Sequence, residues 1–370
     1  NAMTRLILAG GGHAHLFVLE QLALQPRDDL EVVLITPSYL QYYSGMVPGW
    51  MARHYHEDQF AIDLRPLLER ARITFIEQPL AGIDAGRREV CLAAGERISY
   101  DLLSLDIGAE TDTSWLESLG PKLLPIKPLG DFARHWQALL SLEAGTDLEL
   151  AIVGGGAAGL ELALAAQQGL KQRGLAAQVC LVTGDAGVIA GFPCGVRLRA
   201  ENALRRAGIQ VIKRRAVGSN GGLLLSDGSS LNPDYVIAAM GSRPHPWLCL
   251  SGLELDSKGH VLVDRFHRSL SHAEVFAVGD VCSRSDRPLA HSGVNAVRAG
   301  PVLAQNLLAM IDERQLVPYD PPQRSLYLLS CGTPYAIASW GRFSAEGGWV
   351  WRCKDWIDRR FIRRFSCRAS

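Results

Sequence analysis

The sequence predicts an α/β fold in which one strand–turn–helix unit occurs twice along the chain. Two glycine-rich turns, at residues 10–12 and 154–156, each join a short apolar strand to a helix with apolar periodicity. Each unit then continues in the same order, through a further strand, a β-meander and an apolar strand that ends in glycine. This alternation of strands and helices is typical of parallel sheets covered by helices.

The first unit places a strand, a helix and a second strand within residues 5–35. Gly10 and Gly12 match the first two positions of the dinucleotide fingerprint G-x-G-x-x-G, but His15 stands at the third. Glycines let a pyrophosphate approach the backbone, and the start of the helix offers unpaired N–H groups. The helix dipole disfavours an imidazolium here, so a neutral His13 or His15 either donates to a phosphate or ribose, or packs in the core.

The second unit, residues 148–182, carries the complete fingerprint, at Gly154, Gly156 and Gly159. The apolar strand that closes each unit ends at Gly108 in the first and at Gly241 in the second. A single fingerprint is weak evidence, because packing alone also produces glycine-rich turns. Two fingerprints within one longer repeat predict two dinucleotide sites, and two such domains without nucleotides are the alternative.

A later apolar strand ends at Gly279 and Asp280, and a helix follows from about Ser292. Asp280 either caps a turn or contacts a ligand. The strand closes the first unit, so the sequence predicts two Rossmann-like domains of three layers (ββα), the second inserted in the first. The predicted ranges are 3–112 with 263–315 for the first domain, 113–262 for the second, and 316–370 for a C-terminal segment.

The composition limits the classes of partner. The chain has 38 basic and 38 acidic side chains, so a global attraction to nucleic acid has no basis. The eight cysteines lack metal-ligand spacing, and we expect no metal site and mostly reduced, packed thiols. The apolar window at 148–166 contains two glutamates and four glycines, which fits a strand and helix better than a membrane span. No secretion signal follows Met3, so the expected location is the cytoplasm.

Five segments carry a resemblance to a known family: GGGHAH at 10–15, TPSYLQYYSGMVPGW at 36–50, AAMGSRPHPWL at 238–248, SCGTPYAIASWGRF at 330–343 and WVWRCKDWIDRRF at 349–361. With them the chain resembles the flavoproteins of the pyridine nucleotide-disulfide oxidoreductase superfamily, in the branch of type II NADH dehydrogenase and sulfide:quinone oxidoreductase. It is most similar to the NADH-dehydrogenase-like flavoproteins associated with selenide, water dikinase. Histidine is usual at the third fingerprint position there, which implies a variant FAD site.

The resemblance implies that the first domain binds FAD. Asp280 would accept a hydrogen bond from a ribityl hydroxyl, and Thr36 would replace the acid that often binds the ribose. The adjacent Tyr42 and Tyr43 would lie near the flavin or pack between domains. The residues assigned to FAD in this way are Gly10, Gly12, His13, Ala14, His15, Thr36, Pro37, Ser44, Gly45, Leu80, Asp106, Ile107, Gly108, Gly279, Asp280 and His291.

The resemblance also implies that the second domain binds NADH or NADPH. Glu161 would lie near the nicotinamide or flavin, unless it is simply a first-turn glutamate favoured by the helix dipole. Thr183 stands where an acid would bind the ribose 2′-hydroxyl, and no arginine adjoins it in the sequence, so the sequence decides neither between NADH and NADPH nor whether either binds. The residues assigned to the nicotinamide coenzyme are Gly154, Gly156, Ala157, Gly159, Thr183 and Gly241.

Two further candidates for the chemistry are Cys331 and Lys127. The segment of Cys331 resembles the one that covers the flavin in relatives, and Cys194 could complete a redox pair, although their surroundings do not match the cysteine motifs of sulfide:quinone oxidoreductases. Lys127 would place a positive charge near the flavin, or lie on the surface.

The C-terminal tail is basic and aromatic. Residues 352–368 contain seven basic and two acidic side chains, interleaved with apolar ones. Arg360 and Arg364 interrupt the apolar stripe, which arginines at an anionic bilayer surface would tolerate. The tail therefore predicts peripheral attachment to a membrane, such as the cytoplasmic face of the inner membrane. The alternatives are packing on its own domain, a homodimer, or contact with selenide, water dikinase.

These observations predict an FAD enzyme that oxidises NAD(P)H and passes two electrons to a quinone-like acceptor. The first alternative is oxidation of sulfide or selenide, linked to selenium metabolism, which would need a reactive thiol at Cys331. The second is an FAD-binding partner of selenide, water dikinase with little turnover.

Overall fold

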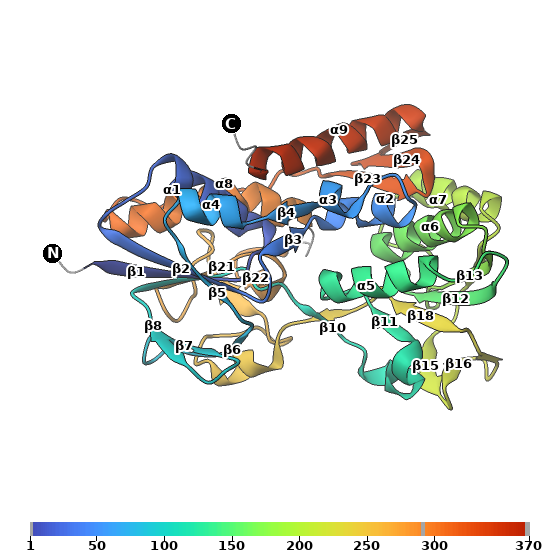
Figure 1. Ribbon diagram of the computed structural model, residues 1–370, viewed down its shortest axis with the longest axis horizontal. Helices are drawn as coiled ribbons and strands as arrows, with labels where there is room; N and C mark the ends of the chain where they lie inside the picture. Colours follow the sequence, from blue (N-terminus) through green and yellow to red (C-terminus); the bar gives the residue numbers. More distant parts are fainter. Residues whose placement is uncertain (1–2, 290–292, 367–370) are drawn as a thin grey trace.

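The structure, a computed structural model, describes residues 3–289 and 293–366. Two domains lie side by side, and the last helix, α9 (Gly348–Phe365), runs above both of them (Figure 1). Each domain contains a five-stranded parallel sheet with helices on one face and a β-meander on the other. The predicted fold class is confirmed.

The sheet of the first domain has the order β21-β9-β1-β2-β5. Along β1, Leu6 and Leu8 pack in the cluster that contains helix residues, whereas Ile7 and Ala9 pack in the cluster of the meander. This follows from the alternation of side chains along a strand. The bounds are β1 (Thr4–Ala9), β2 (Leu30–Thr36), β5 (Thr74–Glu77), β9 (Leu102–Leu105), β21 (Val275–Ala277), helices α1 (His13–Leu24) and α8 (Gly293–Ile311), and meander β6 (Leu80–Asp84), β7 (Glu89–Leu92) and β8 (Arg97–Ser99).

The sheet of the second domain has the order β11-β18-β12-β13-β14. Its central strand β12 is followed by the second glycine turn and by α6, as β1 is followed by the first turn and α1. The bounds are β11 (Leu123–Pro125), β12 (Asp147–Val153), β13 (Ala176–Val182), β14 (Gln210–Ile212), β18 (Tyr235–Ala238), helices α5 (Leu129–Leu140), α6 (Ala157–Gln172) and α7 (Cys194–Arg206), 3-10 helix η2 (Ser114–Lys122), and meander β15 (Ala216–Ser219), β16 (Gly222–Leu225) and β17 (Ser230–Leu231).

The chain passes between the domains twice, through β10 (Glu110–Thr111) and β19 (Ser242–Arg243), which pair antiparallel. After β19 the chain returns to the first domain at once. Leu248 and Leu253 are buried there in one cluster with Ile83, so the predicted boundary at 262 lies within a segment that already packs on the first domain. The elements of this return are η3 (Pro246–Leu250), β20 (Val261–Val263), η4 (Gly279–Val281) and β22 (Cys282–Arg284).

The segment between β2 and β5 of the first domain packs against the second domain. A Cβ at Gly169 of α6 would lie 2.0 Å from the carbonyl oxygen of Met51, so the two backbones are in close contact. This segment consists of β3 (Leu40–Tyr42), η1 (Ser44–Met46), α2 (Val47–Met51), α3 (Glu57–Phe60), β4 (Ala61–Asp63) and α4 (Arg65–Arg70).

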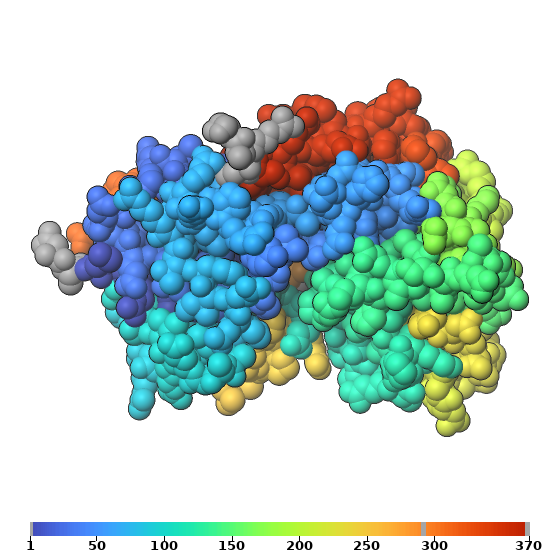
Figure 2. Space-filling model, viewed as in Figure 1, coloured from blue at the N-terminus to red at the C-terminus, as the bar shows by residue number. Residues whose placement is uncertain are grey.

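The C-terminal segment forms an antiparallel sheet of β23 (Leu326–Cys331), β24 (Thr333–Trp340) and β25 (Phe343–Gly347), followed by α9. Figure 2 shows α9 on the outer surface, above both domains. Its Phe365 packs edge-on against Phe17 of α1, with 5.0 Å between ring centroids. Among the described residues, no helix has the length and apolar character needed to cross a membrane.

Candidate functional site

The first glycine turn lies against the end of the neighbouring strand β9. Gly10 has φ +94°, and a Cβ there would lie 2.2 Å from the carbonyl oxygen of Asp106. A Cβ at Gly12 would lie 2.4 Å from the carboxyl group of the same residue. Both glycines are therefore required by close packing as well as by the left-handed backbone at Gly10.

His15, at the third fingerprint position, lies within the core. Its side chain is fully buried, with Nδ1 at 2.7 Å from the Gly10 carbonyl oxygen and Nε2 at 2.8 Å from Ser104 Oγ. Burial lowers the pKa of His15 to about 4, so the ring is neutral, Nδ1–H donates to Gly10 and Nε2 accepts from Ser104. The ring thus joins the turn to β9, which is the core packing that the sequence left open, and the assignment of His15 to the FAD site stays a prediction.

Asp106 occupies the start of α1. Its Oδ2 accepts a hydrogen bond from the backbone N–H of His15 at 3.1 Å, and the N–H of Ala14 also bonds the carboxyl group. Burial raises the pKa of Asp106 to about 7, the charge of Asp280 adds to this rise, and the two N–H donors oppose it. A carboxyl group thus caps the helix end that the sequence assigns to a phosphate, and near neutral pH it is held partly protonated.

The second glycine turn also lies close to the end of a neighbouring strand, with smaller side chains around it. A Cβ at Gly154 would lie 2.5 Å from the carbonyl oxygen of Ala239, the counterpart of Asp106, and a Cβ at Gly159 would lie 1.9 Å from that of Gly154. At Gly156, directly before α6, no described atom lies within 4 Å of the Cβ position. The start of α6, at Ala157, is thus open to a ligand and fits a pyrophosphate.

The other predicted FAD residues of the first domain gather at one edge of its sheet. The carboxyl ends of parallel strands share an edge, and strands β2, β9 and β21 end there. The residues at or after these ends are Thr36, Pro37, Asp106, Ile107, Gly108, Gly279 and Asp280. Leu80 begins β6 shortly after β5 ends, Ser44 and Gly45 lie in η1, and His291 lies outside the described residues.

Three charged or polar predicted residues meet at the junction of the two domains. Lys127, between β11 and α5, donates from Nζ to Asp280 Oδ2 of the first domain at 2.9 Å. Burial lowers the pKa of His13 to about 4, while the charges of Asp280 and Lys127 act on it in opposite directions. Its ring packs edge-on against Tyr43 and Phe361, at centroid distances of 5.3 and 5.7 Å. Residues assigned to the flavin therefore converge from both domains, and Phe361 of α9 packs beside His13.

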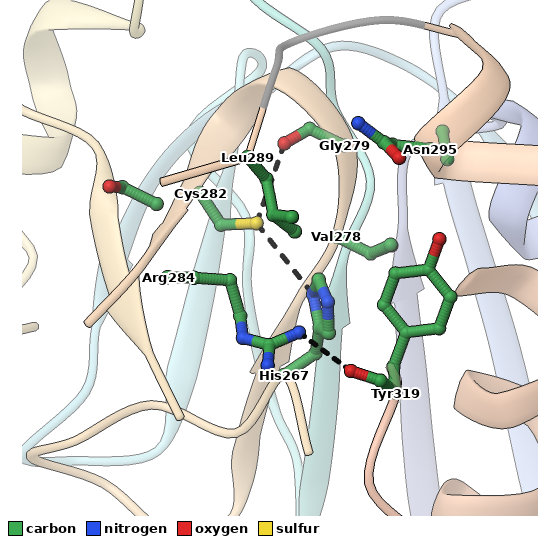
Figure 3. A pocket seen from close by; sticks show the side chains of 10 residues that line it. His267, Val278, Gly279, Cys282, Arg284, Leu289, Asn295 and Tyr319 are labelled. Atoms are coloured by element: carbon green, nitrogen blue, oxygen red, sulfur yellow. Dashed lines mark hydrogen bonds between the residues drawn. The ribbon is translucent and has the colours of Figure 1, made fainter. Parts of the chain in front are cut away.

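A small pocket lies next to Gly279, and Figure 3 shows the side chains that line it. Cys282 Sγ lies 3.4 Å from the Gly279 carbonyl oxygen, and the Arg284 guanidinium donates to the Tyr319 carbonyl at 3.0 Å. The space available to water is about 20 Å³, enough for about one molecule. The pocket is too small for a substrate, and its contacts support the loop that carries Asp280.

A buried charge network that the sequence did not predict links α6, α9 and the η1 loop. Lys354 of α9 donates from Nζ to Asp358 Oδ2 and to the Gly45 carbonyl, both at 2.6 Å. Tyr43 also bonds the Asp358 carboxyl group. Glu161 accepts from the Ser330 backbone N–H at 2.9 Å. The lysine and aspartate stand four residues apart in a basic segment, which is the one sequence signal for this pair.

Burial governs the protonation of the two carboxyl groups in this network. It raises the pKa of Glu161 and of Asp358, and the ammonium group of Lys354 partly offsets the rise at both. Glu161 is thus turned toward the C-terminal sheet and shares an environment with Lys354. The structure brings together residues from three segments that are distant in the sequence.

Cys331 ends β23 and is buried in the main core. Burial and the neighbouring carboxylates of Glu161 and Glu346 raise its pKa to about 12, so the thiol stays neutral. A nucleophilic cysteine needs the opposite, a lowered pKa. Cys194 lies exposed at the start of α7, and both Cys194 and Cys331 are free thiols.

The sequence profile of pyridine nucleotide-disulphide oxidoreductases matches residues 4–304, which contain both glycine turns and the strand before Asp280. The chain belongs to this family. Membership in the pyridine nucleotide-disulphide oxidoreductases implies FAD and a pyridine nucleotide as cofactors, in agreement with the two turns described above. The resemblance identified from the sequence is thereby confirmed at the level of the family.

Two curated relatives cover most of this oxidoreductase. An alternative NAD(P)H-ubiquinone oxidoreductase C1 of Arabidopsis thaliana is 25% identical over 369 residues, covering 86% of this chain and 70% of the relative. A demethylphylloquinone reductase of Synechocystis is 24% identical over 358 residues, covering 92% of this chain and 87% of the relative.

Two solved structures share the fold over nearly the whole chain. NDH2 from Plasmodium falciparum, in complex with NADH, superimposes with a TM-score of 0.81 at 12% identity, covering 98% of this chain and 97% of its own. The sulfide:quinone oxidoreductase of Aquifex aeolicus gives a TM-score of 0.79 at 16% identity, covering 98% and 92%. At this identity the likeness concerns the fold.

Proposed function

We propose that the protein is an FAD-dependent oxidoreductase that transfers two electrons from NAD(P)H to a quinone. The names of two relatives support both substrates, since one is an NAD(P)H-ubiquinone oxidoreductase and the other a demethylphylloquinone reductase. The reaction consumes NAD(P)H, one proton and the quinone, and it yields NAD(P)⁺ and the quinol.

The first domain holds FAD through the turn at Gly10 and Gly12 and through Asp280, and the second holds the coenzyme through the turn at Gly154 to Gly159. Bound FAD supplies the two-electron chemistry between a hydride donor and a quinone. The ion pair of Lys127 with Asp280 fixes the orientation of that carboxylate across the domain junction. Side chains of this chain then have to orient the acceptor and supply its proton.

The observation that carries the proposal is the buried network of Lys354, Asp358, Tyr43 and Glu161. Quinone reduction requires protons at a site from which bulk water is largely excluded. The side chain of Lys354 is only 12% exposed, and its ammonium group acts on two carboxyl groups whose pKa values are raised by burial. We therefore assign to Lys354 the protonation of the quinone oxygen, with Asp358 holding the lysine in position.

The first test is anaerobic stopped-flow reduction of the FAD-loaded protein by NADH, NADPH, sulfide and selenide, followed by flavin absorbance. We expect rapid bleaching by a nicotinamide coenzyme and reoxidation by a short-chain quinone. Cys331→Ser should reduce at the wild-type rate, because the thiol is buried and neutral. Bleaching by a chalcogenide alone, lost in Cys331→Ser, would replace this proposal with chalcogenide oxidation.

The role of Lys354 is tested by Lys354→Met, which removes the ammonium group and keeps a similar volume. Quinone-dependent turnover should fall about tenfold or more, in the range of general acid effects, while flavin reduction by NAD(P)H changes less than about twofold. Lys171→Met, at the distant end of α6, is the matched control and should leave both steps unchanged. Equal losses in both steps for Lys354→Met would refute the assignment.

We also propose that α9 binds an anionic membrane surface. Its outward side carries Trp349 and Trp356, which are 59% and 56% exposed, and Arg360 lies over the Trp356 ring. The adjacent hairpin adds Trp340 and Phe343, at 47% and 53% exposure. Aromatic rings interleaved with arginines suit a lipid interface, where each side chain keeps its polar part in the headgroup layer.

Vesicle co-sedimentation tests the membrane proposal. The wild-type protein should sediment with vesicles that contain an anionic lipid and much less with neutral vesicles. The double variant Trp349→Ala/Trp356→Ala should lose most of this binding, whereas Trp115→Ala, an exposed tryptophan of the second domain, should keep it. Equal sedimentation of all three proteins would show that α9 is not the contact.

The links to selenide, water dikinase and to selenium metabolism, the homodimer and the cytoplasmic location stay predictions from the sequence.

A further inference from the structure

The end of β13, where coenzyme preference is usually decided, continues to pair with the residues after β14. The backbone N–H of Thr183 donates to the Ile212 carbonyl at 3.0 Å, and that of Gly184 donates to the Arg214 carbonyl at 3.1 Å. Three consecutive cations follow Ile212, namely Lys213, Arg214 and Arg215. These cations therefore stand at the same sheet edge as Thr183, although about thirty residues separate them in the sequence.

Lys213 extends toward the glycine turn. The Cβ position of Gly187 lies 3.5 Å from Lys213 Cε and 3.9 Å from its Nζ. The Cβ position of Gly155, within the turn, lies 2.9 Å from the Gly187 carbonyl oxygen and 2.7 Å from that of Thr183. The ammonium group thus lies beside the loop that backs onto the turn, where the adenosine ribose of a bound coenzyme must pass.

The charges around this position favour an anion. Lys213 is exposed and has no ion pair within the described residues. The ion pairs of Arg214 and Arg215 are long, at 3.7 Å to Asp227 and 3.9 Å to Asp185, and such exposed pairs hold their partners weakly. Thr183 itself carries no charge and donates its hydroxyl to the Gly184 carbonyl at 2.9 Å, while the next carboxylate along the chain, Asp185, is exposed and lies beside Arg215.

We propose that Lys213, supported by the two arginines, binds the 2′-phosphate of NADPH, so that the enzyme prefers NADPH to NADH. The inference rests on the proposed function, because it names the coenzyme of the same reaction. A 2′-phosphate brings close to two negative charges to a group of three cations. The ribose of NADH offers a neutral hydroxyl there, and the two acids named above, Asp185 and Asp227, are exposed and pair with the arginines.

The test uses equilibrium binding, which does not depend on turnover. Isothermal titration of the FAD-loaded protein with 2′,5′-ADP and with ADP compares ligands that differ only in the 2′-phosphate. We expect 2′,5′-ADP to bind about tenfold more tightly, and Lys213→Ala to remove most of this difference while leaving ADP unchanged. Lys213→Glu should reverse the preference, and Lys171→Ala should leave it intact.

Two results would overturn the inference: equal binding of both ligands by the wild type, or an equal loss of both in Lys213→Ala. The ratio of kcat/KM for NADPH to that for NADH should exceed one and fall in Lys213→Ala. If neither coenzyme reduces the flavin while 2′,5′-ADP still binds selectively, the proposed function fails and the phosphate site stands. If NADH is the better substrate, the proposed function stands and the phosphate site fails.

Discussion

At the first glycine turn the Gly10 carbonyl accepts a hydrogen bond from the His15 ring, whereas at the second the Gly154 carbonyl meets the bare α-carbon of Gly159. The residue after the neighbouring strand differs as well: Asp106 caps the start of α1, and its counterpart Ala239 has no carboxyl group. At the first turn the His15 ring thus fills the space between strand and helix with buried hydrogen bonds, whereas at the second turn the two backbones touch directly. The comparison teaches that, in both turns, the carbonyl group of the first glycine faces the third fingerprint position, whether a histidine or a glycine stands there.

The largest effect should come from adding a methyl group to the second turn. In Gly159→Ala the new Cβ would fall 1.9 Å from the Gly154 carbonyl oxygen, so helix and strand must separate. We expect the free energy of unfolding to fall by about 3 kcal/mol, measured by thermal or denaturant unfolding. Gly156→Ala, in the same turn but with free space at Cβ, should unfold like the wild type. If Gly159→Ala unfolded like the wild type, the second turn would tolerate a wider gap between strand and helix, as the first turn does around His15.

The first turn should respond to removal of its histidine. His15→Ala leaves a cavity and removes the partner of buried Ser104, so the free energy of unfolding should fall by roughly 2 to 3 kcal/mol. The exposed His135→Ala is the control, and it should change stability little. His15→Gly restores the fingerprint in the sequence but should be no more stable than His15→Ala, because the surrounding residues are spaced for an imidazole. Wild-type stability of His15→Gly would contradict this interpretation.

The two buried groups of the first turn should give opposite dependences of stability on pH. Asp106 has a pKa raised from 3.8 to about 7, so over that window the native state holds a proton that the unfolded state has lost, and stability falls as pH rises. His15 has a pKa lowered from 6.5 to about 4, so stability rises with pH there. Asp106→Asn should remove the first slope and leave the rise between about pH 4 and 6.5, to which His15 contributes about 3 kcal/mol. A pH profile identical to the wild type would show that Asp106 is already ionised in the native state.

The sequence predicts much of this fold because its signals are local. Glycine spacing and apolar periodicity locate both turns, the sheets beside them and the strand before Asp280. The contacts of His15 could not be predicted in this way, since Ser104 lies 89 residues away and only the sheet order brings it to the ring. Asp106 was predicted among the FAD residues, but its position as a cap of α1 depends on how β9 lies beside β1.

The buried charges at the domain junction could not be predicted from the sequence for the same physical reason. Lys354 and Asp358 belong to a segment interpreted as a basic tail, and their burial depends on where α9 lies. The interruption of the apolar stripe also has a tertiary explanation, because Arg364 pairs with Glu20 of α1 at 2.8 Å. The place of Lys213 beside Thr183 has the same cause, because it depends on how β13 pairs with β14, a strand about thirty residues later in the sequence.

The insertion of one domain within the other has a consequence for synthesis on the ribosome. The second sheet is complete once β18 has been made, whereas the first sheet needs β21 and its covering helix α8, which follow much later. The part of the chain made first is therefore the last to close its core, and its growing sheet has an open edge at β9 during that time. Translation order thus sets an order of assembly, in which the coenzyme domain can fold before the flavin domain is finished.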